Sequence, residues 1–191
     1  IITSAELDHM DVFDTWAKQS DAFRKFAASV QKTGLLLLCS DTLDFKSLNL
    51  NPTAPVQTYG LKPADWQAVN ISLENGLTHF DVIRKNASLG TFSMSLSGNH
   101  YIQDTLAAIA LSHNIGVGPE IIRSALLSFQ GVGKRFEILL DSPKLTVIDD
   151  YAHHPTAIKA TLDAARSRYP QRRLWGIYEP HTFTRIKGLL P

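Results

Sequence analysis

The chain has 191 residues and a net charge of +1, with 19 Lys and Arg against 18 Asp and Glu. This balance gives no reason to expect nucleic acid or an acidic membrane as a general partner. Cys39 is the single cysteine and cannot form an internal disulfide, and the apolar runs are shorter than the roughly 18–20 residues of a membrane span. We therefore expect one or two domains of a cytoplasmic protein.

The first third of the chain predicts alternating strands and helices. Residues 1–4 are typical of the end of a strand, and apolar residues at near-helical spacing between 13 and 30 predict an amphipathic helix that ends before Gly34. The apolar run 35–40 predicts a buried strand. This order favours a parallel sheet with helical crossovers, and the fold class is therefore α/β.

The middle of the chain predicts a loop followed by three antiparallel strands. Residues 43–63 are rich in proline and predict mostly loop, with a short strand at 58–60. Beyond them, three strands are expected, and Asn75-Gly76 joins the first two because this dipeptide favours a tight hairpin turn. The pattern predicts an antiparallel meander appended to the parallel sheet; its strands span residues 66–73, 77–84 and 91–96.

Two helices are predicted next. Gly98-Asn99-His100 opens an alanine-rich helix that ends near residue 115, and Pro119 suits the first turn of the following helix. The glycine-rich stretch 130–136 then breaks the pattern, and we place a domain boundary there, between segments 1–132 and 133–191. The second segment is typical of the start of another α/β unit, with strands at 136–140, 145–148 and 174–178 and a helix from 155 to about 168.

The densest polar motif is Asp149-Asp150-Tyr151-Ala152-His153-His154-Pro155, between an apolar run that predicts a buried strand and a predicted helix. The carboxyl end of a strand in an α/β sheet is where ligands usually bind, so the motif predicts a binding site. The alternative is that the two aspartates cap the helix and that the histidines lie on the surface.

Three further motifs are candidates for ligand binding. Asp8-His9-Met10-Asp11 offers ligands for a divalent cation such as magnesium, although a capping Asp11 and a surface His9 are the alternative. Lys134 and Arg135 follow Gly131-Val132-Gly133, a combination that can hold a phosphate or can be a basic interdomain linker. His181 and Arg185 follow the strand predicted at 174–178, where they can meet an anionic substrate.

Together and in this order, these motifs resemble the Mur ligase family over nearly the whole chain. The resemblance implies part of a central ATPase domain followed by the start of a Rossmann-like domain; a preceding domain that holds a UDP sugar lies outside the chain, which we expect to be inactive alone. The similarity is greatest to the member that uses ATP and Mg²⁺ to join L-alanine to UDP-N-acetylmuramate through an acyl phosphate. No nucleic acid and no membrane are expected as partners.

The resemblance also implies roles for individual residues. Positions that hold ATP in the family are matched by His100, Asp104, Arg135 and Asp150. Positions that meet the sugar carboxylate and the amino acid are matched by Tyr151, His153, His154, His181 and Arg185. The metal ligand is matched by His9, and the catalytic groups by Arg135, His154 and Arg185.

One departure from the family matters for the nucleotide. The family usually has Asn where this chain has Asp104, and an ionised carboxylate accepts hydrogen bonds but cannot donate them. Adenine recognition can therefore shift to Tyr101 or Gln103. Two alternatives remain open: a related ligase that recycles murein tripeptide, and a non-catalytic relative that binds a nucleotide or sugar phosphate.

Overall fold

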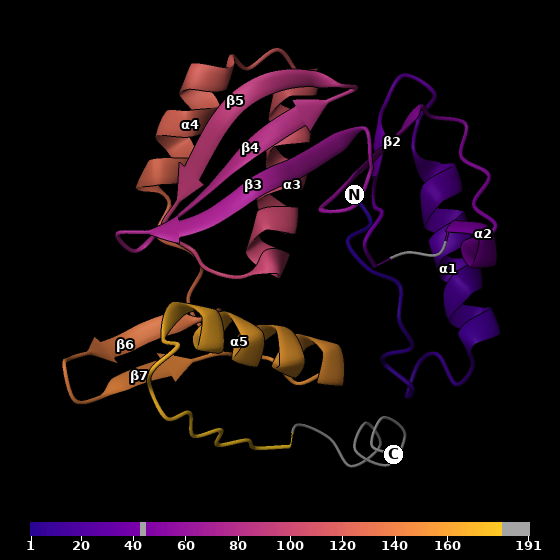
Figure 1. Ribbon diagram of the computed structural model, residues 1–191. Helices are drawn as coiled ribbons and strands as arrows, with labels where there is room; N and C mark the ends of the chain where they lie inside the picture. The colour runs from indigo at the N-terminus through magenta and orange to yellow at the C-terminus, as the bar shows by residue number, and fades with distance from the viewer. Residues whose placement is uncertain (43–44, 181–191) are drawn as a thin grey trace.

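The computed structural model describes residues 1–42 and 45–180, which form a larger part and a smaller part (Figure 1). In the larger part a five-stranded sheet has the order β1–β2–β3–β4–β5. The first two pairings are parallel and the last two are antiparallel, so the α/β class and the appended meander are confirmed. The strands are β1 Leu36–Cys39, β2 Val56–Gly60, β3 Trp66–Glu74, β4 Leu77–Arg84 and β5 Ala87–Met94.

Strand β1 is buried on both faces, which explains its uninterrupted apolar sequence. Leu36 and Leu38 pack with Ala27 of helix α1 (Trp16–Ser29), whereas Leu37 and Cys39 face the cluster that contains helix α3 (Asn99–Asn114). The predicted strand and helix are thus confirmed. Within the predicted loop 43–63, the structure adds a short helix, α2 (Phe45–Leu48), and a β2 that begins earlier than expected.

Tight turns fix the register of the meander. Asn75 and Gly76 have φ angles of 52° and 79°, as a two-residue hairpin turn requires. Lys85 and Asn86 form a second turn with φ angles of 46° and 70°, so β5 starts at residue 87, earlier than predicted. Helices α3 and α4 (Pro119–Ser128) cover one face of this sheet, as Figure 1 shows, and both were predicted.

The smaller part consists of strands β6 (Glu137–Asp141) and β7 (Thr146–Asp149), which pair antiparallel, and helix α5 (Pro155–Arg168). The strand predicted at 145–148 forms as β7, but the prediction that it is buried is wrong: Leu145 is 54% exposed and Val147 38%. Around Ile148 the hairpin packs with Ala164 and Ala165 of α5, and Arg172 donates to the carbonyl oxygen of Ser142 at 2.8 Å, whereas Leu139 is 60% exposed.

The strand predicted at 174–178 is also wrong, because this stretch pairs with no other strand in the described part of the chain. An extended segment becomes a strand only when its backbone groups find partners. Ile177 is 99% exposed, so the apolar sequence here is not buried. Among the described residues, no helix has the length and apolarity needed to cross a membrane.

The two parts meet most closely where α5 passes the start of α3. Gly98, the residue before α3, has a φ of +119°, which residues other than glycine rarely adopt. A Cβ atom at this position would lie 2.8 Å from the Cβ of Ala164 and 2.9 Å from Cε1 of His100. Only glycine therefore allows this approach of the two helices.

We predict that Gly98→Ala destabilises the protein more than Gly116→Ala does. Both glycines have positive φ, but a Cβ at Gly116 would meet no atom within 4 Å. Gly116→Ala should cost about 1 kcal/mol through backbone strain alone, and Gly98→Ala about 1–3 kcal/mol more through overpacking. Urea unfolding of the two variants measures the difference, and equal losses would contradict the close contact.

Candidate functional site

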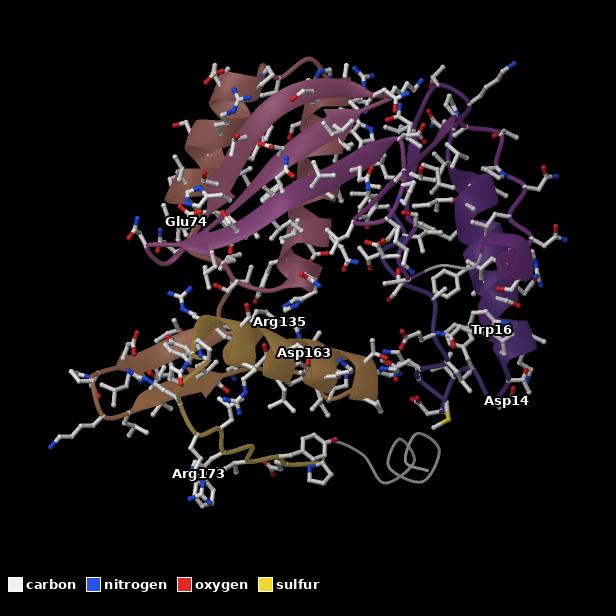
Figure 2. All side chains as sticks on the ribbon, viewed as in Figure 1. Asp14, Trp16, Glu74, Arg135, Asp163 and Arg173 are labelled. Atoms are coloured by element: carbon white, nitrogen blue, oxygen red, sulfur yellow. The ribbon has the colours of Figure 1, made fainter. Side chains whose placement is uncertain are left out.

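A cavity of about 1230 Å³ lies between the start of α3 and the face of α5, next to the ends of β1 and β2. It exceeds the roughly 300–1,000 Å³ of typical small-molecule sites. Most of the wall contributed by α5 consists of small side chains, among them Ala157, Ala160, Thr161 and Ala164. Figure 2 shows Arg135 and Asp163 in the region where the smaller part faces the sheet above it.

The start of α3 brings two rings into this cavity. His100 and Tyr101 contact each other with ring centroids 4.3 Å apart. Burial lowers the pKa of His100, and the negative charge of Asp150 partly opposes this shift. Burial also raises the pKa of Tyr101 to about 12, so the phenol stays neutral. The predicted ATP-binding residue His100 is thus a neutral imidazole beside an aromatic ring.

Asp104 lies one turn further along α3 and also lines the cavity. Its side chain remains accessible, but the surrounding walls limit its hydration, and this burial raises the pKa of the carboxyl group. Gln103, one of the alternatives for reading adenine, is already engaged because its Nε2 donates to Oδ2 of Asp41 at 2.7 Å. Asp41 in turn accepts from the backbone N–H groups of residues 61 and 62.

Asp150 joins two turns of the smaller part. Its Oδ2 accepts from the backbone N–H of Phe136 at 2.8 Å, and its Oδ1 accepts from that of Ala152 at 2.7 Å. The backbone N–H of Tyr151 donates to the carbonyl oxygen of Lys134 at 2.9 Å. The predicted binding turn therefore stands directly against the loop that carries Arg135, and Asp150 has a structural role besides the predicted one.

Arg135 and Tyr151 lie together at this junction. The guanidinium carbon of Arg135 is 5.6 Å from the centre of the Tyr151 ring, which suits a cation–π contact. The ring of His153 meets Tyr151 edge-on at 5.1 Å, and its Nδ1 lies 2.8 Å from the carbonyl oxygen of Tyr151. Arg135 and Asp150 line the cavity, whereas Tyr151, His153 and His154 lie outside its lining.

His154 occupies the N-cap position of helix α5 and contacts the larger part. Its Nδ1 lies 3.2 Å from Oε2 of Glu6 and 3.3 Å from the backbone nitrogen of Thr156. The hydroxyl group of Thr156 donates to the same Glu6 oxygen at 2.6 Å. No local signal in the sequence singles out Glu6 or Thr156, because their partners are about 150 residues away.

The metal prediction concerns His9, which is exposed at the start of a turn. Its Nε2 lies 3.8 Å from Oδ2 of Asp8, so the pair offers a nitrogen and an oxygen ligand. Within the described ranges, no group of three or more His, Cys, Asp or Glu residues could hold a metal ion. These residues alone do not make a complete magnesium site. The predicted residues His181 and Arg185 lie outside the described part of the chain.

Comparison with known proteins agrees with the motifs. Residues 1–112 match the Mur ligase middle domain, and residues 134–187 match the Mur ligase glutamate ligase domain. The chain therefore belongs to the Mur ligase family. The UDP-N-acetylmuramate–L-alanine ligase of Leuconostoc mesenteroides is 41% identical over 188 residues, which are 97% of this chain and 41% of that relative.

Solved structures give the same result. The UDP-N-acetylmuramate–alanine ligase of Thermotoga maritima superposes with a TM-score of 0.73 at 25% identity, covering 89% of this chain and 38% of that one. A murein peptide ligase of Psychrobacter arcticus has a TM-score of 0.62 at 30% identity, covering 94% and 37%. The chain thus spans less than half the length of the relatives it matches.

We predict that His100 titrates below the 6.5 of an ordinary histidine, because its charged form is poorly hydrated. Below about pH 6.5 the unfolded chain then binds more protons at His100 than the folded chain does. The free energy of unfolding is therefore unaffected by His100 above that pH and falls as the pH drops from there toward the folded-state pKa. An NMR titration of the ring Cε1–H signal measures the midpoint. Asp150→Asn removes an opposing charge and should lower the midpoint further; a midpoint at or above 6.5 would contradict the burial.

Proposed function

We propose that the intact protein is an ATP-dependent ligase that joins the amine of L-alanine to the carboxylate of UDP-N-acetylmuramate. Membership of the Mur ligase family supports this activity, and so do relatives that carry the name of this ligase. The observation that carries the proposal is the large cavity between the two family-matched segments, which Arg135 and the start of α3 both line. We also propose the domain division 1–132 and 133–191, and a cytoplasmic location.

In this reaction ATP supplies a phosphoryl group to the sugar carboxylate, and the amine then attacks the activated carbonyl and displaces phosphate. Arg135 would offset negative charge on the nucleotide phosphates, with its fork of donors matched to phosphate oxygens. Asp150 would hold the ribose, and His100 and Asp104 the adenine. The sugar carboxylate and the amino acid would meet Tyr151, His153, His154, His181 and Arg185, with Arg135, His154 and Arg185 as the catalytic groups.

The cavity lining carries too little positive charge to balance a bound triphosphate. Among the described residues that line the cavity, Arg135 is the only Arg or Lys, whereas Asp104, Asp150 and Asp163 are acidic, and only Asp163 has a lysine partner, Lys159. A triphosphate placed beside these carboxylates would be repelled without further positive charge. We therefore propose that Mg²⁺ accompanies the nucleotide, with His9 as one ligand and the remaining ligands supplied from elsewhere.

Phosphate release from ATP by the intact protein tests the function. We expect release that requires UDP-N-acetylmuramate and L-alanine together, because the phosphoryl group is transferred to the sugar and leaves when the amine attacks. Release with the murein tripeptide in place of L-alanine would favour the recycling ligase, since this chain is also similar to the murein peptide ligase of Psychrobacter. Nucleotide binding without any release would favour a non-catalytic relative.

We predict that Asp104→Asn strengthens ATP binding about two- to tenfold at pH 7, since an amide can both donate to and accept from adenine. It also removes a negative charge from the cavity. Because burial raises the pKa of Asp104, lowering the pH should protonate the wild-type carboxyl and narrow the difference. Calorimetry with a non-hydrolysable ATP analogue measures both effects, with Asp21→Asn on α1 as the control. Unchanged affinity would remove Asp104 from the nucleotide site.

A further inference from the structure

Glu6 forms a polar bridge between the larger part and the smaller part. It lies in the same loop as His9, before α1, and its partners His154 and Thr156 open α5. Its Oε2 accepts a 2.6 Å hydrogen bond from the Thr156 hydroxyl and lies 3.2 Å from Nδ1 of His154. One carboxylate oxygen thus contacts both residues at the start of the helix.

The contacts of the His154 ring select one tautomer. A lone pair on Nδ1 would accept weakly from the Thr156 backbone N–H at 3.3 Å but would face the Glu6 carboxylate, which offers no proton when ionised. A proton on Nδ1 instead donates to that carboxylate, which is the stronger, charge-assisted arrangement. The Thr156 N–H belongs to the first turn of a helix, where backbone donors have no partner within the helix, and Thr156 is exposed, so water can accept from it.

The other ring nitrogen supports the same assignment. Nε2 of His154 is buried and has no hydrogen-bond partner among the described residues, and the side chain is only 18% exposed. A buried N–H without an acceptor is rarer in proteins than an acceptor without a donor. The proton therefore belongs on Nδ1, and Nε2 carries the lone pair.

We infer that Glu6 is a positioning residue that fixes the tautomer and the place of His154 and ties the first turn of α5 to the loop of His9. The inference rests on the proposed function, which needs the groups that meet the acceptor to be held in place relative to the nucleotide site. Glu6 touches neither the nucleotide nor the amino acid in this scheme. It acts through His154, as a carboxylate that orients a histidine does in other enzymes.

The first test is independent of activity. Ring-¹⁵N NMR of the intact protein should show His154 with its proton on Nδ1, since protonated and bare ring nitrogens have well-separated shifts. Glu6→Gln keeps an acceptor for Thr156 but loses the charge, so the Nε2–H form should become populated. Thr156→Val keeps the carboxylate beside His154, so the tautomer should persist. A wild-type proton on Nε2, or a tautomer unaffected by Glu6→Gln, would overturn the inference.

The second test separates positioning from binding. In the intact enzyme, Glu6→Gln should lower kcat about tenfold or more, because displaced catalytic groups cost rate, while KM for ATP stays within about twofold. Glu6→Asp, which keeps the charge, should recover part of the rate. Such recovery would show that the loss in Glu6→Gln does not come from misfolding. Glu74→Gln, an exposed acid at the β3–β4 turn (Figure 2) that does not line the cavity, is the matched control and should leave kcat unchanged.

The outcomes distinguish the two proposals. An active wild type with an unchanged kcat in Glu6→Gln would overturn the positioning role, whatever the NMR spectrum shows. A wild type that releases no phosphate with any acceptor would overturn the proposed function, and the tautomer measurement would then still decide whether Glu6 sets the state of His154.

Discussion

Helix α5 is held against the larger part at three separate points, and the cavity depends on all three. At its start, Thr156 and His154 meet Glu6. In its last turns, Ala164 lies where a side chain at Gly98 would have to be. At its end, Nη1 of Arg168 donates to Oγ of Ser97 at 3.0 Å and to the carbonyl oxygen of residue 95 at 3.2 Å.

Three points spread along a helix restrain both its position and its direction. The 14 residues of α5 extend over about 21 Å, so contacts near both ends resist a rotation that the Gly98 contact alone would allow. Between these contacts, Ala157 and Ala160 leave space instead of filling it. The same helix thus holds the two parts together and forms one wall of the cavity. Tyr101, which packs against the apolar clusters of both parts, adds an apolar contact at this junction.

The sequence predicted the elements whose signals are local. The Asn75-Gly76 turn, the apolar run of β1 and the glycine and proline residues that open α3 and α4 act through their own backbone preferences. The two errors, at 145–148 and 174–178, share one cause: apolar residues show that a segment can be buried, but not whether a neighbour covers it or pairs with it. The bridge from Glu6 to Thr156 was missed for the same reason, since its partners meet only in the folded chain.

The internal contacts of the candidate site were not predicted. The family resemblance implies one nucleotide site for Asp150, Arg135 and His100, and these three residues line the same cavity. The sequence did not indicate that the Asp150 carboxylate accepts hydrogen bonds from the backbone N–H groups of residues 136 and 152. This does not conflict with the ribose contact that we propose. A carboxylate offers about four acceptor positions, and two backbone N–H groups leave two of them open.

The structural role of Asp150 in fact makes such a contact more specific. Because its two oxygens are fixed by separate turns, the carboxylate cannot rotate to follow a misplaced ligand. Arg135 has its guanidinium near the face of Tyr151, and among the described residues its N–H donors have no hydrogen-bond partner, so they are available to an anion. A preorganised acceptor beside an available donor at one junction reduces the entropy that a ligand must lose on binding there.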